Sequence, residues 1–173
     1  MMESVIAENF VKPFALNNMS DDHIVEPSRL SNPDTGLVFA NADRVLLNDE
    51  GQWTEIFEIK FVGHYRGREF GDNWSDDYPR KFRYQMLWQM LVARSNGFPV
   101  ESVHLCAMIS NERLFWTQLW WDEKEASEVL EFCLSWWNTH VVPHQLPLVD
   151  GEKEDLAALE RILSGLPDGG EVE

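Results

Sequence analysis

Apolar positions recur along the chain with either helical or alternating spacing. Helical spacing, together with a capping box formed by Asp122 and Glu125, predicts helices at 3–17, 80–95, 122–138 and 152–163. Alternating spacing around two polar turns predicts two antiparallel hairpins, with strands at 37–47 and 53–62 and at 103–109 and 113–121. The order of these elements indicates one mixed α/β domain over residues 1–165.

The remaining segments lack either spacing. Residues 18–35 are polar and contain Pro27 and Pro33, which predicts a loop. Residues 63–79 hold three glycines among charged and aromatic side chains, which predicts a mobile functional loop. Residues 166–173 are predicted to form an acidic flexible tail. The two cysteines lie in separate apolar runs, and no run approaches the length of a membrane span, so we expect a reduced cytoplasmic protein without membrane contact.

The predicted strand at 53–62 carries charges among its apolar positions. Because side chains alternate on a strand, Ile56, Glu58 and Lys60 share one face, while Phe57 and Ile59 share the other. An acid and a base in an apolar strand are costly to bury alone. They therefore need a partner, either a metal ion or each other.

Asp43 supplies a second acid on the preceding strand of the hairpin. Pairing around the turn brings Asp43 close to Glu58, and two converging carboxylates repel one another unless a divalent cation relieves the repulsion. Oxygen ligands of this kind favour Mg²⁺ or Mn²⁺ over Zn²⁺. Such an ion binds a phosphodiester oxygen and lowers the pKa of a water, and Lys60 would hold or help to deprotonate that water.

These signals also have plain structural explanations. A Glu-x-Lys pattern occurs on surface strands as an ion pair between neighbouring strands. Lys81, Gln85 and Gln89 recur every four residues as a polar stripe on an otherwise apolar helix. Such a stripe is typical either of a functional face or of a solvated one.

The charge of the chain at first argues against a nucleic-acid partner. Its 173 residues include 30 acids and 14 bases, for a net charge of −16. The excess acid lies at the two ends, however, whereas residues 60–113 hold eight bases and six acids. A locally positive surface is therefore compatible with the negative total. Arginine suits phosphate geometry, and a loop tryptophan either stacks on an unpaired base or pins the loop. The candidates for DNA contact are Arg66, Arg68, Lys81 and Trp74.

In the order and spacing of these motifs, the chain resembles the lambda exonuclease and YqaJ-like viral recombinase family of the PD-(D/E)xK nuclease superfamily. The matching segments are Asn41-Ala42-Asp43, Glu58-Ile59-Lys60, the helix from Tyr84 to Val92, and a hairpin that leads into Asp122-Glu123-Lys124. The resemblance covers residues 37–140. It implies a restriction-endonuclease-like core, with a mixed central β-sheet flanked by helices.

The resemblance also implies roles for individual residues. Asp43 and Glu58 would bind the metal together with the Ile59 carbonyl, and Lys60 would assist the nucleophilic water. Gln85 would help to position water or the scissile phosphate. The family's upstream helical acid matches Glu3 or Glu8. Glu3 is preferred because the Val-Ile-Ala segment that follows resembles the family's helix.

The implied function is a Mg²⁺- or Mn²⁺-dependent deoxyribonuclease of phage or mobile-element type, which acts like an exonuclease in DNA recombination or processing. The net charge favours one alternative, a catalytically inactive acidic binding protein that mimics DNA or inhibits a DNA-acting enzyme. The acidic total also predicts weak, salt-sensitive DNA binding by the isolated chain. Expected partners besides DNA are an annealing protein, a helicase or another protein subunit, or further copies of this chain.

Overall fold

The computed structural model describes residues 7, 11, 23–31 and 39–145. It divides into two compact units, residues 1–131 and 132–173. The predicted helices at 3–17 and 152–163 lie outside the described residues, except for Ala7 and Val11, and so does the predicted tail. The extent of the predicted domain, 1–165, stays a prediction. None of the helices in the described part has the length and apolar character needed to cross a bilayer.

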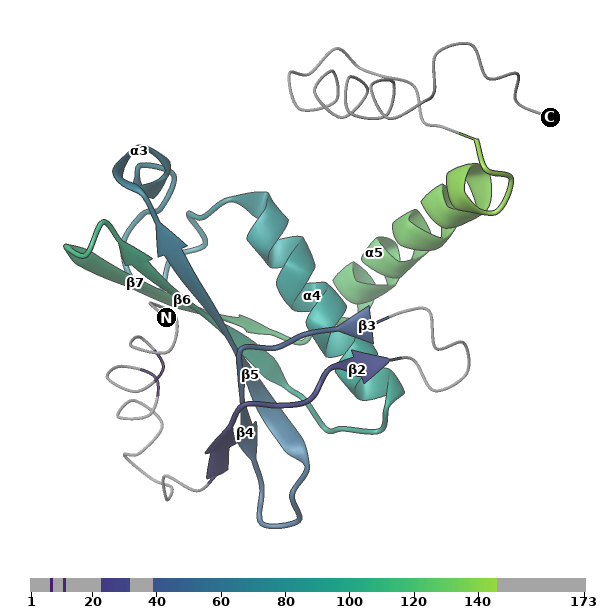
Figure 1. The fold of residues 1–173 in the computed structure, drawn as a ribbon, viewed down its shortest axis with the longest axis horizontal. Helices are drawn as coiled ribbons and strands as arrows, with labels where there is room; N and C mark the ends of the chain where they lie inside the picture. The colour runs from purple at the N-terminus through teal and green to yellow at the C-terminus, as the bar shows by residue number, and fades with distance from the viewer. Residues whose placement is uncertain (1–6, 8–10, 12–22, 32–38, 146–173) are drawn as a thin grey trace, which may run out of the picture. The chain divides into compact units, whose positions relative to one another are not determined.

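A five-stranded mixed sheet organises the first unit (Figure 1). Its strand order is β1-β4-β5-β6-β7, with β5 and β6 parallel and every other neighbouring pair antiparallel. The strands are β1 (Ile24–Val25), β4 (Arg44–Leu47), β5 (Trp53–Val62), β6 (Ser102–Ile109) and β7 (Arg113–Trp120). A separate two-stranded ribbon joins β2 (Leu30–Ser31) to β3 (Phe39–Ala40). The predicted mixed α/β class is confirmed.

Local turn chemistry forms both predicted hairpins. Between β4 and β5, the Asn48 side-chain oxygen accepts the backbone N–H groups of Glu50 at 3.1 Å and Gln52 at 2.9 Å, and Gly51 takes a φ of 75°. Between β6 and β7, Ser110 and Asn111 take φ values of 53° and 59°. These turns fix the register of each hairpin.

The structure corrects two expectations about strands, and it places the short helix α3 (His64–Gly67) within the predicted loop at 63–79. The predicted strand at 37–47 is interrupted at residues 41–43, so that β3 pairs with β2 while β4 belongs to the main sheet. The predicted loop at 18–35 contains β1 and β2. Strands of two residues leave no periodic pattern in a sequence, since their pairing depends on partners that lie far along the chain.

Three helices complete the described fold before the last π-helical turn. They are α3 (His64–Gly67), α4 (Arg80–Ser95) and α5 (Glu123–Trp136), and the π-helix η3 (Trp137–Val141) follows directly. The predicted helix at 80–95 has the same bounds as α4. At the start of α5, Asp122 accepts the Glu125 N–H at 2.9 Å, as the capping box predicts. The Glu125 carboxylate itself binds Arg83 of α4 through two hydrogen bonds of 2.5 and 2.7 Å.

Hydrophobic side chains cover both faces of the sheet. On one face, α4 packs over β5 and β6 (Figure 1), where Ile56 and Leu105 meet Met86 and Leu87. Apolar side chains of the opposite face form a second cluster with the N-terminal residues. This second cluster contains Ala7, Val11, Ile24, Leu46, Phe57, Ile59, Cys106 and Trp116. The predicted alternation along β5 is therefore confirmed.

Candidate active site

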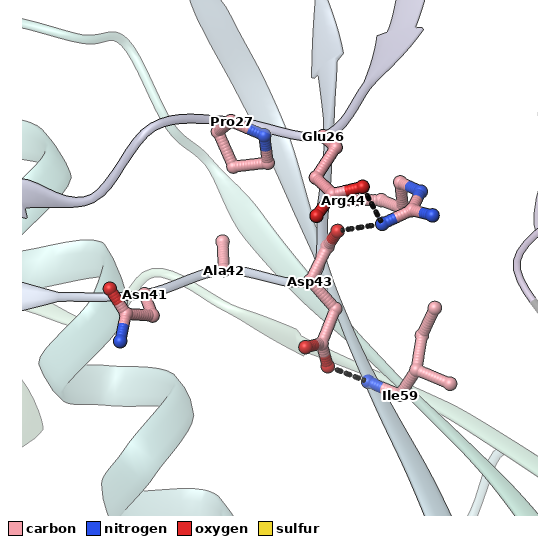
Figure 2. Close-up of a pocket in the computed structure, with 7 residues that line it drawn as sticks. All are labelled: Glu26, Pro27, Asn41, Ala42, Asp43, Arg44 and Ile59. Atoms are coloured by element: carbon pink, nitrogen blue, oxygen red, sulfur yellow. Dashed lines mark hydrogen bonds and ion pairs between the residues drawn. The ribbon is translucent and has the colours of Figure 1, made fainter. Parts of the chain in front are cut away.

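Asp43 lies beside the middle strand of the sheet, directly before β4. The antiparallel register pairs Arg44 with Phe57, and one further step along this register brings Asp43 opposite Glu58. Its Oδ2 accepts the backbone N–H of Ile59 at 2.7 Å (Figure 2). The interruption of the strand at 41–43 thus places a carboxylate where the β4 ladder ends.

Glu58 is a buried carboxylate surrounded by donors. It is 2% exposed and points toward α4. Its Oε1 accepts Gln85 Nε2 at 2.7 Å and forms an ion pair with Lys60 Nζ, while its Oε2 accepts Gln89 Nε2 at 2.5 Å. Burial of a charge without such partners would cost several kcal/mol, about 5 or more. Two residues of the polar stripe of α4, Gln85 and Gln89, therefore help to hold a carboxylate inside the protein.

Ile59 adds a backbone oxygen to these carboxylates. In a strand, the N–H and C=O of one residue face the same neighbour. Because the Ile59 N–H faces Asp43, its carbonyl faces the same side of β5. Ile59 also lines the pocket that contains Asp43.

This acidic pocket has a volume of about 270 Å³ and lies between the segment after β1 and the segment before β4 (Figure 2). Arg44 donates to the Asp43 backbone carbonyl at 2.6 Å and lies 3.4 Å from Glu26. Figure 2 shows the Asp43 carboxylate turned away from Arg44 and toward Ile59. The arginine therefore holds the main chain here, and the carboxylate faces the strand. The lining residues are Glu26, Pro27, Asn41, Ala42, Asp43, Arg44 and Ile59.

A second pocket, which we call the basic pocket, is lined by Lys60 and by residues of α3 and α4. Its volume is about 310 Å³, and it brings Lys60 together with Arg66 of α3 and Lys81 of α4. Both Arg66 and Lys81 are exposed, whereas the Lys60 side chain is 25% exposed. Arg68 lies outside the pocket lining, with its guanidinium carbon 5.7 Å from the Tyr65 ring.

Trp74 lies in a loop that contacts another strand of the sheet, β7. Its backbone N–H donates to the Trp116 carbonyl at 2.7 Å, and the Asn73 side chain accepts the Trp116 N–H at 3.0 Å. These bonds pin the loop against β7, two strands away from β5. The Trp74 ring is 57% exposed, so a stacking surface is present at this edge but lies apart from Asp43 and Glu58.

The role of one polar group of the site, Gln89, was not predicted from the sequence. Gln89 is only 3% exposed, so the interpretation of the stripe as a solvated face is wrong at this position. Its amide also donates to the Asn41 carbonyl at 2.7 Å. The sequence did carry a signal for Gln89, because this glutamine follows Gln85 by one helical turn between the apolar Leu87 and Met90.

The described residues contain no cluster of three or more metal-binding side chains of the His, Cys, Asp or Glu type. Both candidates for the upstream acid, Glu3 and Glu8, lie outside the described residues. Ala7, their neighbour in sequence, is fully buried in the cluster that contains Ile59.

The mixed sheet and its flanking α4 form a restriction-endonuclease-like core. The family model of the YqaJ-like viral recombinase domain matches residues 1–96, more than half of the chain, and the chain belongs to this family. Family and fold together indicate a nuclease.

A solved structure has a similar fold. It is an alkaline exonuclease (LHK-Exo) from Laribacter hongkongensis, with a TM-score of 0.51 and 12% sequence identity. The match covers 93% of this chain and 70% of the exonuclease chain. No curated protein matches the sequence.

Proposed function

We propose that this protein is a metal-dependent DNA nuclease of phage or mobile-element type, which works like an exonuclease in DNA recombination or processing in the cytoplasm of the host cell. The observation that supports it best is the grouping around Glu58. A buried carboxylate, a neighbouring acid and a partly exposed lysine share one end of the middle strand. This combination of negative and positive groups suits metal-assisted chemistry at a phosphodiester.

The donor set of the site fits a hard divalent cation. The Asp43 carboxylate, the Ile59 carbonyl and the Glu58 carboxylate are all oxygen ligands, and they belong to adjacent positions of β5 and its neighbour. Mg²⁺ and Mn²⁺ prefer such ligands. Glu3 or Glu8 would add a further carboxylate. When bound, the ion would polarise a phosphodiester oxygen and lower the pKa of a water.

Lys60 and Gln85 would act on the attacking water and on the phosphate. The Lys60 ammonium lies next to Glu58 at the mouth of the basic pocket, where it would orient the water and offset negative charge that develops on the phosphate. The Gln85 side chain is exposed although its amide reaches Glu58. Its position suits a group that holds water or the scissile phosphate.

The basic pocket would contact the DNA backbone. Its lining carries three positive charges, from Lys60, Arg66 and Lys81, and one negative charge, from Glu69. Phosphate contacts by such side chains give affinity that falls steeply with salt. The structural similarity to LHK-Exo, an alkaline exonuclease, supports action at the ends of linear DNA.

Incubation of the purified chain with linear duplex, single-stranded and circular DNA tests this function. With Mg²⁺ or Mn²⁺ we expect cleavage of linear DNA that EDTA abolishes and that Lys60→Ala reduces by at least about 100-fold. Lys124→Ala is the matched control, because Lys124 is 88% exposed on α5. The proposal fails if no DNA is cut with either ion, or if Lys60→Ala cuts as well as the wild type.

The net charge of −16 favours a second candidate function, an inactive acidic binding protein that mimics DNA or inhibits a DNA-acting enzyme. Titration with Mn²⁺ by calorimetry separates the two. Binding that Glu58→Gln abolishes would argue for the nuclease, and the absence of binding would argue for the mimic. If activity is weak at physiological salt, a partner would supply the additional DNA affinity. Such a partner would be an annealing protein, a helicase, another protein subunit or further copies of this chain.

A further inference from the structure

Gln89 connects the two chain segments that carry the acids of the site. It lies on α4, one turn after Gln85, and is 3% exposed. Its Nε2 donates to Glu58 Oε2 at 2.5 Å and to the Asn41 carbonyl at 2.7 Å. Asn41 precedes Asp43 by two residues within the interruption between β3 and β4. One amide group therefore holds β5 and the segment of Asp43 at the same time.

The orientation of the Gln89 amide follows from its neighbours. Both hydrogens of Nε2 face oxygens, one of a carboxylate and one of a backbone carbonyl. The reversed amide would direct its own oxygen at these two acceptors, and the three oxygens would repel one another. The observed orientation is thus the one that the site requires.

This arrangement leaves the other end of the amide unsatisfied. Gln89 Oε1 is buried and has no hydrogen-bond partner among the described residues. A buried acceptor without a partner carries a cost in stability. An apolar side chain of similar size, such as methionine, would avoid this cost and would suit the apolar surroundings of Met86 and Met90. The glutamine is therefore better explained by its two donated bonds than by core packing.

We propose that Gln89 is a positioning residue for the metal site, which fixes the direction of the Glu58 carboxylate and the separation between β5 and the Asp43 segment. The inference rests on the proposed nuclease function. Among the described residues, Glu58 Oε1 receives Gln85 and Lys60, whereas Oε2 receives Gln89. Without Gln89, the carboxylate keeps its charge partner but loses the bond that fixes its second oxygen. Residues that orient metal ligands in this way typically contribute about 10–100-fold to metal affinity or activity.

The test compares the Mn²⁺ affinity of the full chain with its stability, by calorimetric titration and by urea unfolding. Gln89→Met should weaken Mn²⁺ binding by about 10–100-fold, because the carboxylate is no longer oriented. Its midpoint of urea unfolding should fall, because Glu58 Oε2 and the Asn41 carbonyl lose their donor, but removal of the unpartnered Gln89 Oε1 offsets part of this loss, so the variant should remain folded under the conditions of the titration. Gln89→Leu is a second apolar variant that serves if the methionine variant does not fold.

Met90→Leu is the matched control for repacking of α4, because Met90 is fully buried next to Gln89 and both side chains in this exchange are apolar. We expect this variant to bind Mn²⁺ like the wild type. DNA cleavage gives a second reading, in which Gln89→Met lowers kcat and leaves KM for DNA unchanged, since Gln89 does not line the basic pocket.

The outcomes separate the inference from the function on which it rests. If the wild type binds Mn²⁺ and the apolar variants bind it equally well, Gln89 has only a structural role and the inference is overturned. If the wild type neither binds Mn²⁺ nor cuts DNA, the proposed nuclease function fails, and the role of Gln89 fails with it.

Discussion

The Asp43 carboxylate accepts the backbone N–H of Ile59 at 2.7 Å, at the point where the pairing between β4 and β5 ends. The same side chain therefore has two tasks. It satisfies a buried donor of the sheet, since Ile59 is 1% exposed, and it presents negative charge to the acidic pocket. The first task needs an acceptor oxygen, whereas the second needs a charge.

Substitutions of Asp43 should separate these tasks. Asp43→Asn keeps an oxygen that can accept the Ile59 N–H, so we expect the free energy of unfolding to change by less than about 1 kcal/mol. Asp43→Ala leaves that N–H unsatisfied and should cost about 1–3 kcal/mol. Both variants should lose Mn²⁺ binding. Urea unfolding and calorimetric titration check this, and equal stability of the two variants would contradict the structural task.

Gly67 holds the helix of Arg66 against the sheet. A Cβ at Gly67 would lie 2.2 Å from Ile109 Cγ2, so Gly67→Ala must displace α3 or the end of β6. Overpacking of this kind costs about 1–3 kcal/mol. At Gly63, the other end of the same short helix, a Cβ would meet nothing within 4 Å. Thermal unfolding should therefore show a loss for Gly67→Ala and little change for Gly63→Ala, and equal effects would refute this packing argument.

The basic pocket predicts how DNA affinity depends on salt. Arg66→Gln and Lys81→Gln should each reduce the slope of log K against log salt by about 1, because each removes one phosphate contact. Thermal stability should not change, since both side chains are exposed. Lys124→Gln, on the exposed face of α5, is the control and should leave the slope as it is. Fluorescence anisotropy with short duplexes measures the slope, and an unchanged slope in both pocket variants would exclude this pocket from DNA binding.

Cys106 predicts a loss of stability at alkaline pH. Burial raises the pKa of its thiol well above the usual value, and the negative charges of Asp43 and Glu58 raise it further. Above the pKa of the unfolded thiol, about 8.5, the unfolded chain releases this proton while the folded protein keeps it. The free energy of unfolding should therefore fall as pH rises, by at most about 1.4 kcal/mol per pH unit from this group.

Urea unfolding between pH 8 and pH 10.5 measures that fall. Cys106→Ala should make the decline shallower, although the buried Tyr78, whose pKa is also raised by burial, leaves part of it. Cys133→Ala is the control. Burial also raises the pKa of the Cys133 thiol, but this side chain is only partly buried, so its replacement should change the decline less than Cys106→Ala does. A Cys106→Ala decline as steep as that of the wild type would contradict the assignment.

The parts of the fold that the sequence predicts are those with local causes. The turn at Asn48 and Gly51 fixes its hairpin through its own side chain and a positive φ, and the apolar spacing of 80–95 is sufficient for α4. The two-residue strands β1 and β2 depend on partners that lie about 10 to 20 residues further along the chain, so no local pattern announces them.

The same distinction applies to the site. Asp43 and Glu58 could be brought together from the turn and the alternation along β5, both of which are local. The part played by Gln89 could not be predicted, because its second bond reaches Asn41, 48 residues earlier in the chain, and requires the break between β3 and β4 that the sequence did not reveal. The position of Trp74 likewise depends on Trp116 of a distant strand.

The parallel pairing of β5 with β6 determines when this centre matures during biosynthesis. Glu58, Lys60 and the amides of α4 all precede Ser102, the first residue of β6. Every residue of β6 then pairs with β5. A ribosome that adds about 5–20 residues per second needs about 0.7–2.6 s to pass from Gln89 to Ser102. A nascent chain therefore carries all of these polar groups before it has the strand that encloses Glu58, and the centre is completed only when translation has passed Ile109.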